Sequence, residues 1–416
     1  MEKKKSPVGK TQVFEGEALG KDPYLALGAS ADKRALHELL KDCGCSDDSG
    51  FFARLSEDLA GDPSYYSFIH SDGCGTKSIV AYLLYRETGD ESYFAGLAQD
   101  ALVMNLDDVF CVGEPQSLLF SNAIARNASL VEEPPLAAIV REYCRLTELF
   151  KSLGIPLSMS GGETADCADT VRTLMVDLTL CGRIPKARTI NTGNVKSGDL
   201  IVGLSSTGRA GYENENNSGI SSNGLTLARH VLLRRSYARK YPEVSDPNIA
   251  EELSYRGPYG LLDEVEELGT TVGKALLSPT RSYAPILAQI YRELAENGKL
   301  GDSIHAVINV TGGGQAKILN FGRDKLYVKD DLFPPPPLFE LIQREGQIDW
   351  RQMYRVFNMG HRVEICARED CLERIVSIAN SFGVEAKRIG YVKDSPTRGQ
   401  NRVEVQTPKG SYEYTR

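Results

Sequence analysis

The sequence is poor in the residues on which many hydrolytic and zinc enzymes depend. Only five histidines occur among its 416 residues, and no two of them are four residues apart, as a helical zinc site would require. No G-x-S-x-G segment is present to hold a nucleophilic serine. The phosphate-binding loop G-x-x-x-x-G-K-[ST] is also missing. Acyl-enzyme chemistry, zinc hydrolysis and the common nucleotide-binding loop are therefore disfavoured.

Long apolar runs and an excess of positive charge are absent as well. The longest apolar stretch, 79–85, ends at Arg86 and is far shorter than the roughly 18 residues of a membrane span. The basic start 1–5 is not followed by the apolar segment of an export signal, so we expect a cytosolic protein without membrane contact. A net charge of −8 argues against general nucleic-acid binding.

The nine cysteines are scattered along the chain, and only Cys43 and Cys45 are close in sequence. That pair has no second pair at the spacing of a zinc site. An odd number of cysteines in a large chain without an export signal also argues against a disulfide framework. We expect free thiols.

Strand and helix patterns alternate along most of the chain, which predicts an α/β (α+β) fold with mixed sheets flanked by helices. Strands are expected at 65–70, 117–125, 156–159, 171–184, 200–204, 304–310, 362–367, 385–392 and 402–406, and helices at 77–88, 93–104, 135–153, 222–235, 261–268, 281–297, 338–345 and 371–381. The first 60 residues give no clear pattern. The segment 185–198 contains Pro, Gly and Asn without periodicity. We place a domain boundary there, between residues 1–190 and 191–416.

The segment Asp72-Gly73-Cys74-Gly75-Thr76-Lys77 stands between an expected strand and an expected helix. Its two glycines allow a ligand to approach the backbone closely. Lys77 and the free amide groups of the helix start attract anions, while a carboxylate at the strand end can bind Mg²⁺ together with phosphate oxygens. The alternative is a tight turn capped by Asp72.

Three further segments fit the same chemistry. The adjacent carboxylates in 105–108 repel each other at a helix end, which a metal ion would relieve, although a solvated acidic helix end is the commoner case. In 160–166, Gly-Gly leaves room for a ligand and Glu163 adds a carboxylate, unless the segment is only a turn. The glycines in 311–314 can form a nest of amide groups for phosphate or a flexible turn. Together these segments favour phosphate and Mg²⁺ chemistry.

Taken in order, these segments resemble the aminoimidazole ribonucleotide synthetase family. The family patterns D-G-V-G-T-K, N-D-[LI], G-A-E-P, G-G-E-T-A-E, S-N-G, L-x-P-T-R-x-Y, T-G-G-G and M-x-R-x-F-N-x-G are matched here at 72–77, 107, 113–115, 161–166, 222–224, 277–283, 311–314 and 353–360. The resemblance covers about residues 65–395. The matches at 277–283, which contains Pro-Thr-Arg, and at 353–360 point to the ring-closing ligase rather than to its relatives.

The resemblance implies two domains, a homodimer in which N-terminal sheets of two subunits join, and ATP with Mg²⁺ near that junction. The nucleotide would contact Asp72, Gly73, Gly75, Thr76, Lys77, Asp107, Gly161, Gly162, Gly312 and Gly313. Asp72, Asp107 and Glu163 would serve the metal, and Lys77, Asp107 and Glu163 the catalysis. The implied reaction converts ATP and formylglycinamidine ribonucleotide into aminoimidazole ribonucleotide, ADP and phosphate.

The sequence also departs from the family pattern. Leu106, Ser221 and Asn309 stand where the family has Asn, His and His, and the segments 209–220 and 240–260 are additional. The family's N-terminal motifs are not visible in 1–64. Two alternatives therefore stay open: a related ATP-dependent enzyme with another acceptor, and a non-catalytic nucleotide-binding regulatory protein.

Overall fold

The computed structural model describes residues 23–28, 39, 42–43, 49–295 and 299–415. Its first sheet has five strands in the order β1 (Ser56–Glu57), β2 (Tyr65–Gly73), β5 (Leu174–Pro185), β3 (Ser117–Arg126) and β4 (Leu157–Asp166). β3 and β4 run parallel, whereas the other neighbouring strands run antiparallel. The long connection through a helix is what allows β3 and β4 to be parallel.

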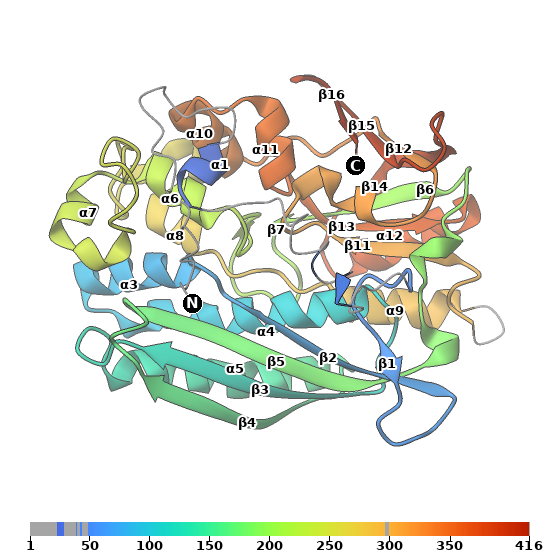
Figure 1. Cartoon of the computed structure of the whole chain (residues 1–416), viewed down its shortest axis with the longest axis horizontal. Helices are drawn as coiled ribbons and strands as arrows, with labels where there is room; N and C mark the ends of the chain where they lie inside the picture. The colour runs from blue at the N-terminus through green and yellow to red at the C-terminus, as the bar shows by residue number, and fades with distance from the viewer. Residues whose placement is uncertain (1–22, 29–38, 40–41, 44–48, 296–298, 416) are drawn as a thin grey trace, which may run out of the picture.

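Two long helices cover one face of this sheet. They are α4 (Ala95–Phe110) and α5 (Glu133–Ser152), and α3 (Lys77–Thr88) directly follows β2 (Figure 1). β3 alternates between buried and exposed side chains, so its even-numbered residues face the helices and its odd-numbered residues face away. α5 begins with prolines in its first turn, where the missing amide hydrogens cost nothing.

The second sheet has seven strands. Their order is β11 (Ile304–Asn309), β13 (His361–Ala367), β6 (Leu200–Ser205), β14 (Ala386–Asp394), β12 (Lys325–Lys329), β15 (Arg402–Thr407) and β16 (Gly410–Thr415). Only β12 and β15 are parallel neighbours. α9 (Ala284–Leu294) and α12 (Leu372–Ser381) pack beside this sheet (Figure 1). Two short hairpins, β7 (Thr207–Gly208) with β8 (Asn217–Ser218) and β9 (Glu264–Val265) with β10 (Thr270–Thr271), lie outside it.

The remaining helices lie together beside the second sheet, and most of them come from the second half of the chain. They are α6 (Leu225–Leu232), α7 (Ser236–Lys240), α8 (Val272–Leu277), α10 (Pro337–Gly346) and α11 (Trp350–Val356), together with the short N-terminal α1 (Pro23–Ala26) (Figure 1). Seven 3₁₀ turns complete the described elements: Glu91–Phe94, Lys186–Arg188, Thr192–Asn194, Pro242–Val244, Glu266–Leu268, Gly314–Asn320 and Glu369–Cys371. No helix of the described residues is both long and apolar enough to cross a bilayer.

The predicted mixed α/β fold is confirmed, with four local corrections. The helix predicted at 93–104 continues to Phe110 and includes the carboxylates of 105–108, and Asp107 is buried rather than solvated. The helix predicted at 261–268 is wrong, because this segment forms β9 and a 3₁₀ turn. The strand predicted at 65–70 continues to Gly73, and the one predicted at 156–159 continues to Asp166. The segment with Gly161 and Glu163 therefore lies inside a strand rather than in a turn. β12, β16 and α11 were not predicted.

The buried apolar side chains form one continuous core that reaches from the first sheet to the second. Tyr291 of α9 is fully buried, and its hydroxyl donates to the Phe110 carbonyl of α4 over 2.6 Å. The two sheets use residues 56–185 and 200–415, and the division of the chain into 1–190 and 191–416 remains a prediction. Cys74, Cys111 and Cys366 are buried free thiols, whereas Cys45 lies outside the described residues.

Candidate active site

A polar cluster forms where β2 and α4 end side by side. His70 and Asp72 lie on the same face of β2, the face that packs against α4. Asn105 of α4 donates to the carbonyl oxygens of Asp72 (3.0 Å) and Leu178 (3.1 Å), which fixes the end of the strand on the helix. The Asn105 side-chain oxygen in turn accepts from His70 Nδ1 over 2.9 Å. The other ring nitrogen, Nε2, lies 3.5 Å from the Asp108 carboxylate.

These neighbours shift the acid–base equilibria of the cluster. Burial raises the pKa of Asp72, and the nearby charge of Asp108 raises it further. Burial opposes ionisation of Asp108 too, but the hydrogen bond from His70 and the charge of Lys317 lower its pKa overall. Burial disfavours protonated His70, yet Asp108 raises the pKa of this imidazole overall. The cluster therefore combines a carboxylate whose pKa is lowered, Asp108, with one whose pKa is raised, Asp72.

The segment 309–317 brings two more groups to this cluster. Asn309, at the end of β11, donates from Nδ2 to Asp108 over 2.6 Å, and its buried Oδ1 has no hydrogen-bond partner. Lys317 donates to Thr311 Oγ1 over 2.8 Å, and its ammonium lies 5.2 Å from the Phe52 ring centroid. Lys317 also influences the ionisation of both Asp72 and Asp108. The triple-glycine segment thus supplies a cation beside two carboxylates.

The glycines of this segment are required by the backbone. Gly313 and Gly314 both have positive φ angles, of 101° and 51°. A Cβ on Gly314 would lie 2.5 Å from the Tyr354 carbonyl oxygen and 2.8 Å from that of Phe357. Gly312 has open space around it, with Asn223 Nδ2 3.8 Å from the position of a Cβ. Gly312 therefore leaves room for a ligand, whereas Gly314 serves the contact with the 353–360 run.

The structure does not bring Lys77 to a ligand. Its side chain is fully buried, and its ammonium donates to Asp100 Oδ1 over 2.8 Å and to the Ser278 carbonyl. Burial lowers the pKa of Lys77, against the opposing charge of Asp100. Asp100 also accepts from Thr280 through its amide (2.8 Å) and its hydroxyl (2.6 Å). Lys77 therefore joins α3 to the Pro-Thr-Arg segment. The predicted contact with a phosphate would instead require its ammonium to face solvent.

Asp107 is turned away from the cluster as well. It is fully buried, with Oδ1 accepting from Ser282 Oγ (2.8 Å) and from the amide of Tyr283 (3.0 Å). Arg362 donates to its other oxygen over 3.2 Å. Burial, moderated by Arg362, raises the pKa of Asp107 to about 6. Its neighbour Asp108, one residue further along α4, is the carboxylate that faces Asp72.

Glu163 is far from Asp72 within one chain. Strand pairing places Asp72 opposite Leu178, Leu178 opposite Asn122, and Asn122 opposite Gly162. Three interstrand spacings separate Asp72 from Gly162, which amounts to about 14 Å. Glu163 is exposed on the edge strand β4. The three predicted metal ligands Asp72, Asp107 and Glu163 are thus not neighbours, and no group of three potential ligands is found among the described residues.

The other predicted glycines divide into two groups. Gly73 and Gly162 are closely packed, since a Cβ would lie 1.8 Å from Asp177 Oδ1 and 1.8 Å from Asn122 Oδ1 respectively. Gly161 has open space, and Gly75, with φ of 55°, meets nothing closer than the Ser222 carbonyl at 3.7 Å. Gly75 and Thr76 lie at the start of α3, and Thr76 Oγ1 is 3.1 Å from Thr226 Oγ1.

The additional segment 209–220 closes over the Pro-Thr-Arg motif. Glu213 forms a buried ion pair with Arg281, with Nη2 and Oε2 2.6 Å apart. Tyr212 donates to the Ser282 carbonyl over 2.5 Å, and Asn217 donates to the Pro279 carbonyl over 2.7 Å. The arginine of the motif is therefore neutralised within the chain, and the segment is packed against the site rather than loosely attached to the surface.

Sequence reasoning missed His70, Asp108 and Lys317 as members of the site. A signal existed for His70, which lies two residues before Asp72 and so shares its face of the strand. Lys317 carried a weaker signal, since it follows the triple glycine by three residues. The choice between Asp107 and Asp108 depends on the rotation of α4, which adjacent residues cannot reveal.

Comparison with known protein families identifies the family to which this chain belongs. The family model described as AIR synthase related protein, N-terminal domain, matches residues 47–184, and the corresponding C-terminal domain matches residues 196–399. The chain belongs to the AIR synthase family. It is similar to phosphoribosylformylglycinamidine cyclo-ligase from Methanocaldococcus jannaschii, with 30% identity over 82% of this chain and 81% of the relative. The corresponding enzyme of Methanothermobacter thermautotrophicus is 31% identical over 90% of this chain and 91% of the relative.

Solved structures share the fold at low sequence identity. AaThiL complexed with AMPPCP and TMP has a TM-score of 0.51 and 12% identity, covering 92% of this chain and 96% of that one. T. maritima PurL complexed with FGAR has a TM-score of 0.50 and 14% identity, covering 88% of this chain and 46% of that one. These similarities support the mixed two-sheet architecture.

Proposed function

We propose that the chain is an ATP-dependent cyclo-ligase that closes formylglycinamidine ribonucleotide to aminoimidazole ribonucleotide in purine biosynthesis in the cytoplasm. The observation that carries this proposal is the similarity, over 82–90% of the chain, to relatives named phosphoribosylformylglycinamidine cyclo-ligase. A fragmentary match could reflect the fold alone, whereas this one includes both halves of the chain.

The contacts of the 353–360 run support the proposal. Phe357 packs against Gly224, where a Cβ would lie 2.2 Å from the ring. Asn358 accepts from Ser206 Oγ (2.9 Å) and donates to the Gly219 carbonyl (2.8 Å). Its carbonyl accepts from Gln315 over 2.6 Å. The run therefore joins the S-N-G and T-G-G-G motifs, which are far apart in sequence.

Asp72, Asp108 and Lys317 are the groups best placed for the phosphates of ATP. Mg²⁺ binds through one or two carboxylates together with substrate phosphates, and the carboxylates of Asp72 and Asp108, with the unpartnered Oδ1 of Asn309, are oxygen donors of this kind. The ion would neutralise phosphate charge. AaThiL was solved with the ATP analogue AMPPCP, which supports ATP as the nucleotide here.

The proposed reaction needs positioned groups more than a protein nucleophile. The amide oxygen of the substrate attacks the γ-phosphorus of ATP, ADP leaves, and an iminophosphate forms. The neighbouring amidine nitrogen then attacks the activated carbon, the C–O bond breaks, phosphate leaves, and the nitrogen loses a proton. Lys317 would stabilise the transferred phosphoryl group, and His70 would hold a proton near it.

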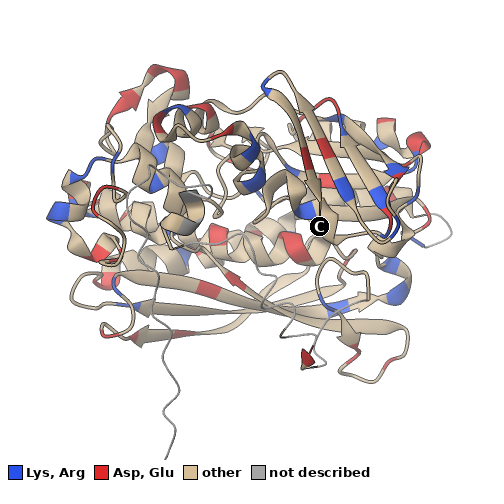
Figure 2. Cartoon of the chain, turned by 45° about the horizontal axis from the view of Figure 1, so that its top comes forward, with Lys and Arg blue, Asp and Glu red and all other residues tan. Residues whose placement is uncertain are grey.

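A homodimer is part of the proposal, and the outer face of the first sheet is the surface for it. Ile69, Leu119 and Met175 are 74%, 47% and 46% exposed on the face that α4 and α5 leave uncovered. Ile69 and Leu119 both pair with Cys181, so they are near neighbours. Figure 2 shows few charged residues along these strands.

A related enzyme with another acceptor remains the second candidate, because Arg281 is already neutralised by Glu213 and because Ser221 and Asn309 replace histidines of the family pattern. The experiment that separates the candidates measures ADP, phosphate and the aminoimidazole product with ATP, Mg²⁺ and formylglycinamidine ribonucleotide. Equal amounts of ADP and product support the cyclo-ligase. Turnover of ATP without product indicates another acceptor, and nucleotide binding without turnover indicates a regulatory protein.

A further inference from the structure

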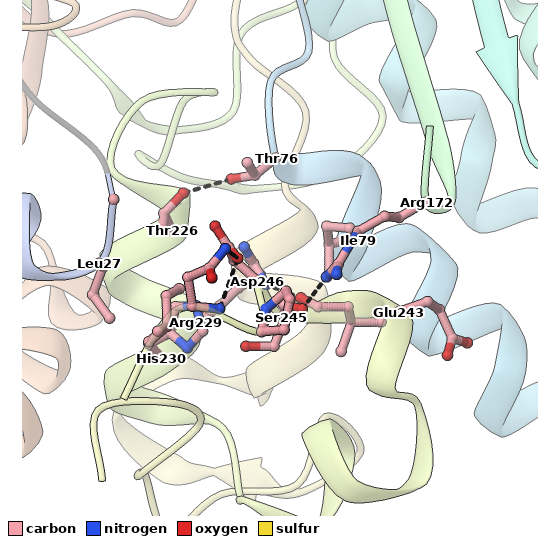
Figure 3. Close-up of a pocket in the computed structure, with 15 residues that line it drawn as sticks. Leu27, Thr76, Ile79, Arg172, Thr226, Arg229, His230, Glu243, Ser245 and Asp246 are labelled. Carbon is pink, nitrogen blue, oxygen red and sulfur yellow. Dashed lines mark hydrogen bonds between the residues drawn. The ribbon is translucent and has the colours of Figure 1, made fainter. Parts of the chain in front are cut away.

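A pocket borders the 72–77 turn at Thr76, and none of the side chains of the Asp72 cluster lines it. Its volume is about 540 Å³, within the size range of small-molecule sites. It lies between the starts of α3 and α6, the loop before β5 and the segment 243–249, and Leu27 and Gly28 close one side (Figure 3). Segment 243–249 belongs to the additional stretch 240–260, so part of the pocket wall is absent from the family pattern.

Hydrogen bonds hold this additional wall in place. The Val244 carbonyl accepts from Arg229 (3.3 Å) and from the Tyr255 hydroxyl (3.2 Å). Two hydrogen bonds hold Ser245. Its carbonyl accepts from Arg172, and its hydroxyl lies 2.7 Å from the hydroxyl of Ser254. These bonds reach α6 and the loop before β5, so the pocket is already formed in the chain without a ligand.

Arg229 is the most informative group in the pocket. Its side chain lines the pocket and is only 3% exposed, yet the described residues place no carboxylate within ion-pair distance of its guanidinium. Nη1 donates to the Tyr255 hydroxyl (2.5 Å) and the Val244 carbonyl (3.3 Å), the guanidinium lies 5.7 Å from the Tyr255 ring centroid, and the buried Nε has no hydrogen-bond partner among the described residues. Buried charges in proteins are normally paired, because desolvation without a counter-charge is costly. An anionic ligand would supply the missing partner.

The surrounding groups are consistent with an anion. The exposed Arg172 adds a second positive charge, while His230 adds none, because burial and the adjacent Arg229 lower the pKa of His230 to about 3. Two acids, Glu243 and Asp246, also line the pocket, and each already accepts a hydrogen bond from the protein. Glu243 accepts from Tyr82 and lies 3.9 Å from Arg86, and Asp246 accepts twice from Asn248.

The rest of the lining fits a body larger than a free ion. Ile79, Pro247 and Ile249 provide apolar surface, and the bonded hydroxyls of Thr76 and Thr226 lie at the start of α3 and α6 (Figure 3). An inorganic phosphate would leave most of this volume empty. A phosphate carried on a sugar or a nucleoside would place its charge at the arginines and its body against the apolar side.

We propose that this pocket binds a phosphorylated ligand of nucleotide size, with Arg229 and Arg172 holding its phosphate. Binding of a phosphorylated ligand is inferred from the pocket itself, whereas the choice between the ribonucleotide and ATP as that ligand rests on the proposed function. Thr76 joins this pocket to the turn that also carries Asp72, so the ribonucleotide and ATP would meet across one turn. The additional segment 240–260 would then set which phosphorylated substrate is accepted.

The test measures binding calorimetrically with two probes, ribose 5-phosphate and AMPPCP, in the full-length protein. Arg172→Gln and Arg229→Gln should each weaken binding of ribose 5-phosphate by about tenfold or more, because each removes a charge-assisted hydrogen bond. Arg239→Gln is the matched control, since Arg239 of α7 is 71% exposed, directly precedes the additional stretch and pairs with Glu251 outside the pocket. Thermal melting checks that each variant is folded, and if Arg229→Gln fails this check, the exposed Arg172 carries the test.

The outcomes are distinct. Weaker binding of ribose 5-phosphate with unchanged AMPPCP binding supports the pocket as the ribonucleotide site, and weaker binding of AMPPCP supports it as a phosphate site for ATP. Unchanged affinities in folded variants, or no binding of either probe by the native chain, overturn the proposal. The binding measurement needs no turnover. A chain that does not catalyse the cyclo-ligase reaction could therefore still bind ribose 5-phosphate in this pocket, and unchanged binding in the arginine variants would not exclude the reaction.

Discussion

The buried pair of Lys77 and Asp100 gives the sharpest test of how the 72–77 segment works. Both side chains are fully buried, and Asp100 Oδ2 has no hydrogen-bond partner. Replacing Lys77 by methionine keeps the length of the side chain but leaves the Asp100 carboxylate without its counter-charge. The two hydrogen bonds from Thr280 would remain, but these are neutral donors.

The size of the effect follows from this burial. Removing one partner of a buried ion pair costs about 3–5 kcal/mol, because the other charge is left desolvated. Lys77→Met should therefore lower the free energy of unfolding by that amount. The double variant Lys77→Met/Asp100→Asn should recover at least about 1 kcal/mol, since the uncompensated charge is gone and the two residues are in contact.

Urea denaturation followed by fluorescence measures these differences, and the KM for ATP is measured on the folded variants. Lys151→Met is the matched control, because its pair with Glu148 is solvent-exposed and should contribute about 0–1 kcal/mol. We expect the KM for ATP of Lys77→Met to change by less than about twofold. A variant as stable as the native chain with a strongly raised KM would refute this reasoning and would make Lys77 a phosphate ligand.

Three further predictions concern the cluster, the pH dependence and the dimer. Lys317→Ala should raise the KM for ATP by about tenfold with little loss of stability, since among the described residues its ammonium has a hydroxyl and an aromatic ring as its contacts and forms no close ion pair; an unchanged KM would remove it from the site. Because the folded-state pKa of Asp107 is raised to about 6 from 3.8, its contribution to stability is present below pH 3.8 and is lost as pH rises through 6. Between pH 3.8 and 6, the free energy of unfolding should therefore fall by about 3 kcal/mol less in Asp107→Asn than in the native chain. An equally steep fall in the variant would contradict this expectation. Ile69→Asp should shift the mass in sedimentation experiments from dimer to monomer, whereas an intact dimer would place the interface elsewhere.

Periodicity predicted most of the regular structure because the helices are amphipathic and long. α3 begins and ends where its apolar spacing indicated, at Lys77 and Thr88. The segment 261–268 misled because four acidic residues and three leucines mimic a helical pattern, while β9 and its turn depend on pairing with β10. β4 was predicted too short for a similar reason, since pairing with β3 keeps a glycine-rich segment extended.

The candidate site depends on contacts that the sequence does not show. The segments 72–77 and 311–314 do lie at strand ends, as predicted, but the side chains within them point in different directions. Lys77 follows two glycines and begins a helix, which is the usual setting of a phosphate ligand. Whether it faces a ligand or the core depends on Asp100 and Ser278, which are distant in sequence. Residue type and spacing cannot reveal such a partner.

Two departures from the family pattern involve residues that contact each other in the structure. The family has Leu or Ile after its conserved aspartate and His before Thr-Gly-Gly-Gly, while this chain has Asp108 and Asn309. Asn309 donates to Asp108 over 2.6 Å, so the new carboxylate and the new amide are direct partners. A histidine lost at 309 is accompanied by His70, whose ring lies beside the same carboxylate. Proton-carrying capacity is thus retained at the cluster, on β2 instead of β11, and for this reason the missing histidine is weak evidence for a non-catalytic protein.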